Sequence, residues 1–142
     1  MTNSLKVVNI VIVFNPSETE VLMCYRTKDP YKGLYNFLGG KKENNESNTE
    51  SAYRELFEES GISSADIELT ALFTTQYHRD GIELQVFFGT LKHAVDLVPE
   101  KHPLHWITIA DQDFADNTKF AGQGNIKHMV EMLVNSQQGK GL

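Results

Sequence analysis

Residues 40–62 read GKKENNESNTESAYRELFEESGI, and the spacing of their charged side chains decides how the rest of the chain is interpreted. Glu58 and Glu59 follow Glu55 by three and four residues, so on an α-helix the three carboxylates share one face. Like charges at such spacings destabilise a bare helix by roughly 0.2–0.5 kcal/mol per pair. A hard divalent cation that prefers oxygen ligands, Mg²⁺ above all, would offset this repulsion. The stretch therefore predicts a helix that binds a metal ion.

Both ends of this helix are marked in the sequence. Ser47 and Glu50 have the spacing of a capping box, in which each side chain accepts a hydrogen bond from the other residue's backbone N–H. Gly61 supplies the left-handed residue that closes a helix. The apolar side for docking on a sheet is expected to consist of Ala52, Leu56 and the ring of Tyr53 or Phe57.

The remaining chain predicts an α/β (α+β) protein with strands on both sides of this helix. Apolar or alternating runs indicate strands at 6–14, 21–26, 67–77, 82–91 and 105–109, and a helix at 126–134. Residues 29–40 contain a proline and three glycines and are expected to form mainly a loop. Asp80 and Gly81 are typical of a hairpin turn. This order excludes a simple helical bundle.

Length and composition favour one compact domain. The chain has 142 residues, a net charge of −6 and one cysteine, Cys24. We expect a single domain over residues 1–142, since no linker or repeat divides it. One cysteine allows no internal disulfide, which is compatible with a cytoplasmic protein. The amino-terminal apolar run is too short for a membrane segment, and the acidic charge argues against nucleic-acid binding.

The central stretch resembles the Nudix box, GX5EX7REUXEEXGU, in which U is a bulky aliphatic residue. Every position of the pattern fits, as Gly40, Glu46, Arg54, Glu55, Leu56, Glu58, Glu59, Gly61 and Ile62. Leu38 is a departure, because relatives often carry proline before the paired glycines. The resemblance implies the Nudix fold, a mixed β-sheet between helices.

The resemblance also implies site residues. Glu55, Glu58 and Glu59 are the expected metal ligands, together with the backbone carbonyl of Gly39. Glu55 and Glu58 are expected to be catalytic, with Arg54 as the residue that orients them. Glu55 is the preferred proton acceptor, and Glu58, Glu59 and residues outside the box remain alternatives. Glu46 is expected to fix Arg54 or the loop.

Further candidates lie outside the box or at its edge. Glu100 resembles an additional metal ligand, against the alternative of a solvated loop acid. Arg26 and Lys41 are expected to contact the substrate, and each is otherwise an ordinary surface cation. Asn125 resembles a base-recognising residue, although it also stands where a helix N-cap belongs. Tyr77 is a candidate for stacking on a base, although alternating aromatics in strands more often belong to the core.

Together these features predict a Mg²⁺-dependent hydrolase, in which Mn²⁺ can replace Mg²⁺, that acts on a nucleoside diphosphate linked to another group. The preferred substrate is a nucleoside triphosphate such as 8-oxo-dGTP, cleaved to the monophosphate and pyrophosphate. An ADP-ribose or dinucleotide pyrophosphatase uses the same metal helix and is the enzyme alternative. A non-catalytic nucleotide-sensing module is the alternative from another class. The expected partner is a small nucleotide, and the sequence leaves monomer and homodimer open.

Overall fold

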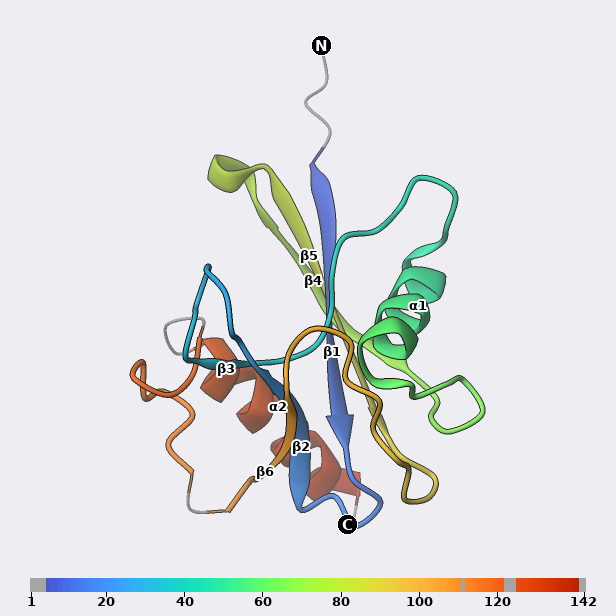
Figure 1. The fold of residues 1–142 in the computed structure, drawn as a ribbon, viewed down its shortest axis with the longest axis vertical. Coiled ribbons are helices and arrows are strands. Elements are labelled where there is room, and N and C mark those ends of the chain that lie inside the picture. Colours follow the sequence, from blue (N-terminus) through green and yellow to red (C-terminus); the bar gives the residue numbers. More distant parts are fainter. Residues whose placement is uncertain (1–4, 111, 122–124, 141–142) are drawn as a thin grey trace.

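The computed structural model describes residues 5–110, 112–121 and 125–140, and it shows one mixed β-sheet with an α-helix on each face (Figure 1). Within these residues the strands are β1 (Lys6–Phe14), β2 (Glu20–Tyr25), β3 (Tyr35–Asn36), β4 (Thr70–Tyr77), β5 (Ile82–Thr90) and β6 (Leu104–Thr108). The helices are α1 (Asn48–Ser60), α2 (Asn125–Lys140) and the short 3-10 helix η1 (His78–Asp80). This is the mixed sheet between helices that the sequence predicts.

The strands of the sheet follow the order β3-β2-β1-β5-β4, with β1 in the centre. The pair β1 and β5 is parallel, with partners running from Lys6 opposite Ile82 to Phe14 opposite Thr90. The other pairings are antiparallel, and β6 pairs with β2 outside the main order. Parallel strands with helices on both faces are usually buried throughout, which explains the nearly continuous Val/Ile run of β1.

Alternation along β1 divides the core into two layers. Val11 and Val13 pack with Ala52 and Leu56 of α1. Ile12 and Phe14 point to the other face, where they belong to the cluster that includes residues 126, 129, 130 and 133 of α2. All four of these β1 side chains are fully buried. The first layer fixes α1, and with it the acidic face of that helix, against the middle of the sheet.

The predicted ends of α1 are confirmed. Ser47 and Glu50 form both hydrogen bonds of a capping box, and Gly61 closes the helix in the left-handed conformation, with φ of 78°. The expected apolar side is only partly correct. Phe57 is 56% exposed, whereas Tyr53 packs against the core and its hydroxyl accepts a hydrogen bond from the backbone N–H of Leu69.

Several predicted ends of strands and loops differ from the observed ones, because pairing with distant segments sets where each strand begins and ends. The expected loop at 29–40 contains β3, because Tyr35 and Asn36 pair with the end of β2. The strand expected from residue 67 begins at Thr70, and Ile67 forms only an isolated bridge to Leu91. The turn at Asp80 and Gly81 is present, preceded by η1. Among the described residues, no helix combines the length and the apolar character that a membrane span requires.

Candidate active site

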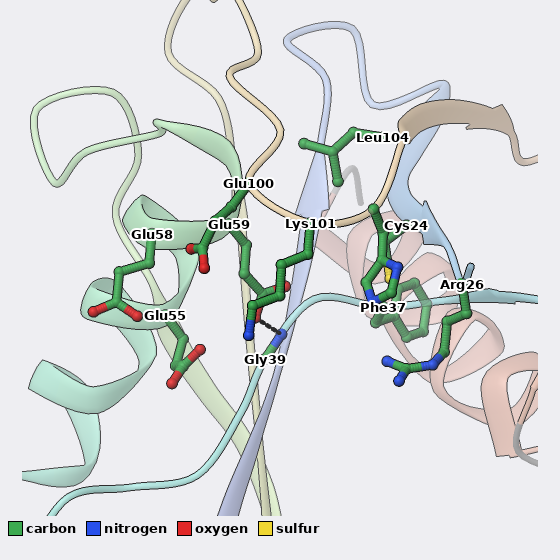
Figure 2. A pocket seen from close by; sticks show the side chains of 11 residues that line it. Cys24, Arg26, Phe37, Gly39, Glu55, Glu58, Glu59, Glu100, Lys101 and Leu104 are labelled. Atoms are coloured by element: carbon green, nitrogen blue, oxygen red, sulfur yellow. Dashed lines mark hydrogen bonds between the residues drawn. The ribbon is translucent and has the colours of Figure 1, made fainter. Parts of the chain in front are cut away.

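A cavity of about 330 Å³ opens beside the acidic face of α1 (Figure 2). Glu55, Glu58 and Glu59 line it from α1, and Glu100 joins them from the loop before β6. Arg26 lies on the opposite side of the cavity from Glu55 and Glu58. The complete lining is Cys24, Arg26, Phe37, Gly39, Glu55, Glu58, Glu59, Glu100, Lys101, His102 and Leu104. The fold thus brings together all five of the predicted metal-binding residues.

Arg54 holds the carboxylates from the side of the helix. Its Nε and Nη2 each donate a 2.8 Å hydrogen bond to Glu46, which forms a bidentate pair. Its Nη1 donates to Glu55 at 3.0 Å and to Glu58 at 3.1 Å. The pair with Arg54 is the main reason that the pKa of Glu46 falls to about 2. Arg54 therefore contacts two of the predicted ligands, Glu55 and Glu58, as well as Glu46.

The pKa of the Glu59 carboxyl group is raised to about 8. Burial is the largest cause, and the hydrogen bond and charge of Glu55 act in the same direction. The backbone N–H of Gly39 donates to Glu59 Oε1 at 3.4 Å and opposes this effect (Figure 2). Two crowded carboxylates in a partly buried site favour a bound cation.

Gly39 is required because the chain there passes close to the backbone of β1. A Cβ on Gly39, whose φ is 143°, would lie 2.1 Å from the carbonyl oxygen of Asn9. A Cβ on Gly40 would lie 2.5 Å from the carboxyl carbon of Glu55, at the movable end of that side chain. The Asn9 side chain accepts a 3.2 Å hydrogen bond from Gly40 N–H and donates a 2.7 Å bond to Ser51 of α1. This buried amide ties the glycine loop to α1.

The donor set fits a hard divalent cation. Glu55, Glu58, Glu59, Glu100 and the Gly39 carbonyl are all oxygen donors of the type that Mg²⁺ and Mn²⁺ prefer. In the described part of the chain, no three His, Cys, Asp or Glu side chains are already grouped closely enough to hold a metal ion. Glu55 and Glu58 instead contact Arg54, and Glu59 accepts a hydrogen bond from Gly39, so a cation held by all three would require these side chains to turn towards one another.

The side of the cavity opposite Glu55 and Glu58 is basic, because Arg26 lies there (Figure 2). Arg26 Nε donates a 2.6 Å hydrogen bond to the carbonyl of Pro30, and Lys101 and His102 also line the cavity. His102 Nδ1 accepts a 3.1 Å hydrogen bond from the backbone N–H of Thr27. Burial lowers the pKa of His102, and the charges of Arg26, Lys101 and Lys28 lower it further. The cavity therefore has an acidic wall and a hydrogen-bond-donating wall.

Two predicted substrate contacts, Tyr77 and Lys41, do not appear in this lining. Tyr77 lies at the end of β4 and lines a separate cavity with residues of α2. Lys41 is exposed and contributes its backbone carbonyl, which accepts a 3.1 Å bond from Arg54. Asn125 is the first residue of α2, and its side chain lies outside the described residues.

The fold adds four residues to the site that were not predicted from the sequence. Phe37, Lys101 and His102 line the cavity, and Asn9 anchors the glycine loop. Two signals were available in the sequence. One was the pair His102 and Pro103 before a strand, and the other was the polar residue Asn9 inside the Val/Ile run of β1. Cys24 is a buried residue of strand β2, as expected. Burial together with the charge of Glu59 raises the pKa of its thiol, which disfavours a reactive thiolate.

Comparison with known proteins identifies the family of this chain. The NUDIX domain family matches residues 4–126. The chain belongs to the Nudix family and is a Nudix hydrolase. No curated protein sequence matches it significantly.

Several solved structures share the fold. A MutT structure from work on Aliivibrio salmonicida and Vibrio cholerae is 24% identical, with a TM-score of 0.66, and the match covers 89% of this chain and 98% of that one. A C. elegans Ap4A hydrolase is 16% identical, with a TM-score of 0.67 over 91% of this chain and 98% of that one. The NUDIX domain of Shewanella oneidensis NrtR, complexed with ADP-ribose, is 18% identical, with a TM-score of 0.67 over 89% and 87%.

Proposed function

We propose that this chain hydrolyses the diphosphate linkage of a nucleoside triphosphate, with 8-oxo-dGTP as the preferred candidate, and releases the monophosphate and pyrophosphate. The observation that carries the proposal is the cavity with carboxylates of α1 on one side and Arg26 on the other, with Lys101 also in its lining. Such a site can hold a polyphosphate between divalent cations and fixed positive charges.

The cation is Mg²⁺, which Mn²⁺ can replace, with Glu55, Glu58, Glu59, Glu100 and the Gly39 carbonyl as its ligands. When bound, a divalent cation neutralises phosphate charge and makes water a better nucleophile. Glu55 takes the proton of the attacking water as a new P–O bond forms, and the bond to the bridging oxygen breaks. The departing pyrophosphate keeps that electron pair. Arg54 keeps Glu55 and Glu58 in place during this step.

Cavity size favours a single nucleotide. A volume of about 330 Å³ is near the lower limit of the roughly 300–1,000 Å³ seen for small-molecule sites. A dinucleotide would have to extend well beyond it. The likeness to MutT, which spans nearly the whole of both chains, favours the same choice. ADP-ribose, the ligand of the NrtR structure, remains the alternative that another relative supports.

A substrate panel tests the proposal. Purified protein is incubated with Mg²⁺ and 8-oxo-dGTP, dGTP, ADP-ribose or Ap4A, and products are separated by ion-exchange chromatography. We expect the largest kcat/KM for 8-oxo-dGTP, with 8-oxo-dGMP and pyrophosphate as products. Preferred cleavage of ADP-ribose or Ap4A would support the alternative enzyme class. Binding without turnover of any nucleotide would indicate a sensing module and overturn the proposal.

A further inference from the structure

The hydrogen bond between Thr27 and His102 fixes which ring nitrogen of the histidine carries its proton. The Thr27 backbone N–H can only donate, and its partner at 3.1 Å is His102 Nδ1. The Thr27 hydroxyl lies 3.0 Å from the same nitrogen. Because Nδ1 must accept, the proton of the neutral ring lies on Nε2. His102 is therefore a fixed hydrogen-bond donor at its free end.

That free end belongs to the cavity wall. His102 lines the cavity together with Arg26 and Lys101, and no hydrogen bond joins Nε2 to any other described residue. The carboxylates of α1 lie across the cavity from Arg26 (Figure 2). A ligand spanning from those carboxylates to the basic wall would meet His102 Nε2–H.

The surroundings of His102 select the kind of acceptor that it meets. Arg26 and Lys101 line the cavity together with His102. Cationic side chains attract an anionic oxygen far more strongly than a neutral carbonyl of a base. The His102 Nε2–H adds a directed hydrogen bond to this attraction.

We propose that His102 is a substrate-binding residue whose Nε2–H donates to a phosphate oxygen of the substrate, so that it recognises the diphosphate and not the base. The proposal rests on the function proposed above, and it identifies a side chain that contacts the substrate of that reaction. Losing a hydrogen bond to a charged group weakens binding on the order of 10- to 100-fold. The loss should be the same for adenine and guanine nucleotides.

Two amide substitutions separate the two ring nitrogens. The Asn amide occupies the position of Nδ1, so His102→Asn keeps an acceptor for Thr27 and removes the donor in the cavity. The Gln amide reaches the position of Nε2, so His102→Gln restores that donor. His93→Asn is the matched control, because His93 is an exposed histidine that contacts Asp66.

Calorimetry with non-hydrolysable nucleotides tests the proposal without requiring turnover. Each variant is titrated, with Mg²⁺ present, with the α,β-methylene diphosphates of adenosine and guanosine. We expect His102→Asn to weaken binding of both about equally, at unchanged melting temperature, and His102→Gln and His93→Asn to bind nearly as the parent does. Parental affinity in His102→Asn, a loss for one base only, or an equal loss in His102→Gln would overturn it.

The same titrations separate this proposal from the proposed function. If His102→Asn loses affinity as expected but the parent cleaves no nucleotide, the phosphate contact stands and the hydrolase assignment falls. If the parent cleaves nucleotides and His102→Asn binds as the parent does, the hydrolase assignment stands and the role of His102 falls.

Discussion

Arg54 and Glu46 form a bidentate ion pair, with two hydrogen bonds of 2.8 Å from Nε and Nη2 to the two carboxylate oxygens. This geometry leaves Nη1 to contact Glu55 and Glu58 at once. Glu46 lies in the loop before α1, so the pair joins the loop to the helix and sets the direction of the guanidinium. We propose that Arg54 acts on the chemistry through the carboxylates that it positions.

Arg54→Lys should lower kcat by roughly 10- to 100-fold while the fold is kept, which is the range seen when groups that orient metal ligands are lost. A lysine ammonium cannot make the planar fork to Glu46 and reach both other carboxylates. Steady-state kinetics at saturating Mg²⁺ measure the effect, and circular dichroism checks the fold. A folded Arg54→Lys protein with the parental kcat would contradict the positioning role.

The ion pair also predicts a pH-dependent contribution to stability. Arg54 holds the pKa of Glu46 at about 2, below its unfolded value near 4.5. A depressed folded pKa stabilises the protein fully above pH 4.5, and this contribution is lost as the pH falls towards 2. The free energy of unfolding, measured in urea, should therefore differ most between parent and Glu46→Gln near pH 6, and the difference should shrink towards pH 3. A difference that stays constant over this range would argue against the ion pair.

The buried amide of Asn9 should couple the glycine loop to α1. Asn9→Leu leaves Ser51 and the Gly40 N–H without this partner, which should cost about 1–3 kcal/mol of stability. Because Asn9 and Ser51 share one hydrogen bond, Asn9→Leu and Ser51→Ala should not be additive, with a coupling energy of about 0.5 kcal/mol or more. Urea unfolding of the two single variants and the double variant measures it, and strict additivity would speak against the network.

The features that could be predicted from the sequence are those whose residues lie close together along the chain. The capping box and the closing glycine of α1 lie within a few residues of the contacts they make, and the β1 run reports burial on both faces directly. These features were sufficient to place three carboxylates on one helical face. The identity and spacing of the residues carried the information.

The rest of the site depends on contacts between distant segments. Asn9 meets Ser51 across 42 positions of sequence, and Thr27 meets His102 across 75. Neither pair leaves a periodic signal. Tyr77 was predicted to contact the substrate but lines a different cavity. An aromatic residue at the end of a strand does not indicate which cavity that end adjoins.

Among the proposed ligands, Glu58 offers the cleanest test of metal binding. Glu58→Gln removes one charge with little change in size and should lower kcat on the order of 10²-fold or more. The side chain is half-exposed, so the fold should tolerate the change. Glu68→Gln makes the same chemical change at an exposed site outside the cavity and should retain the parental rate. Equal rates for the two variants would remove Glu58 from the ligand set.

We propose that the carboxylates of α1 hold the divalent cation on which hydrolysis depends. The most direct measurement is the turnover of the best nucleotide from the panel in excess EDTA, followed by titration with Mg²⁺, Mn²⁺ or Zn²⁺. We predict that turnover stops in EDTA and returns with Mg²⁺ or Mn²⁺, because every proposed ligand is a hard oxygen donor. Zn²⁺ should restore less, since zinc sites favour nitrogen and sulfur ligands. Full turnover in excess EDTA would contradict the account.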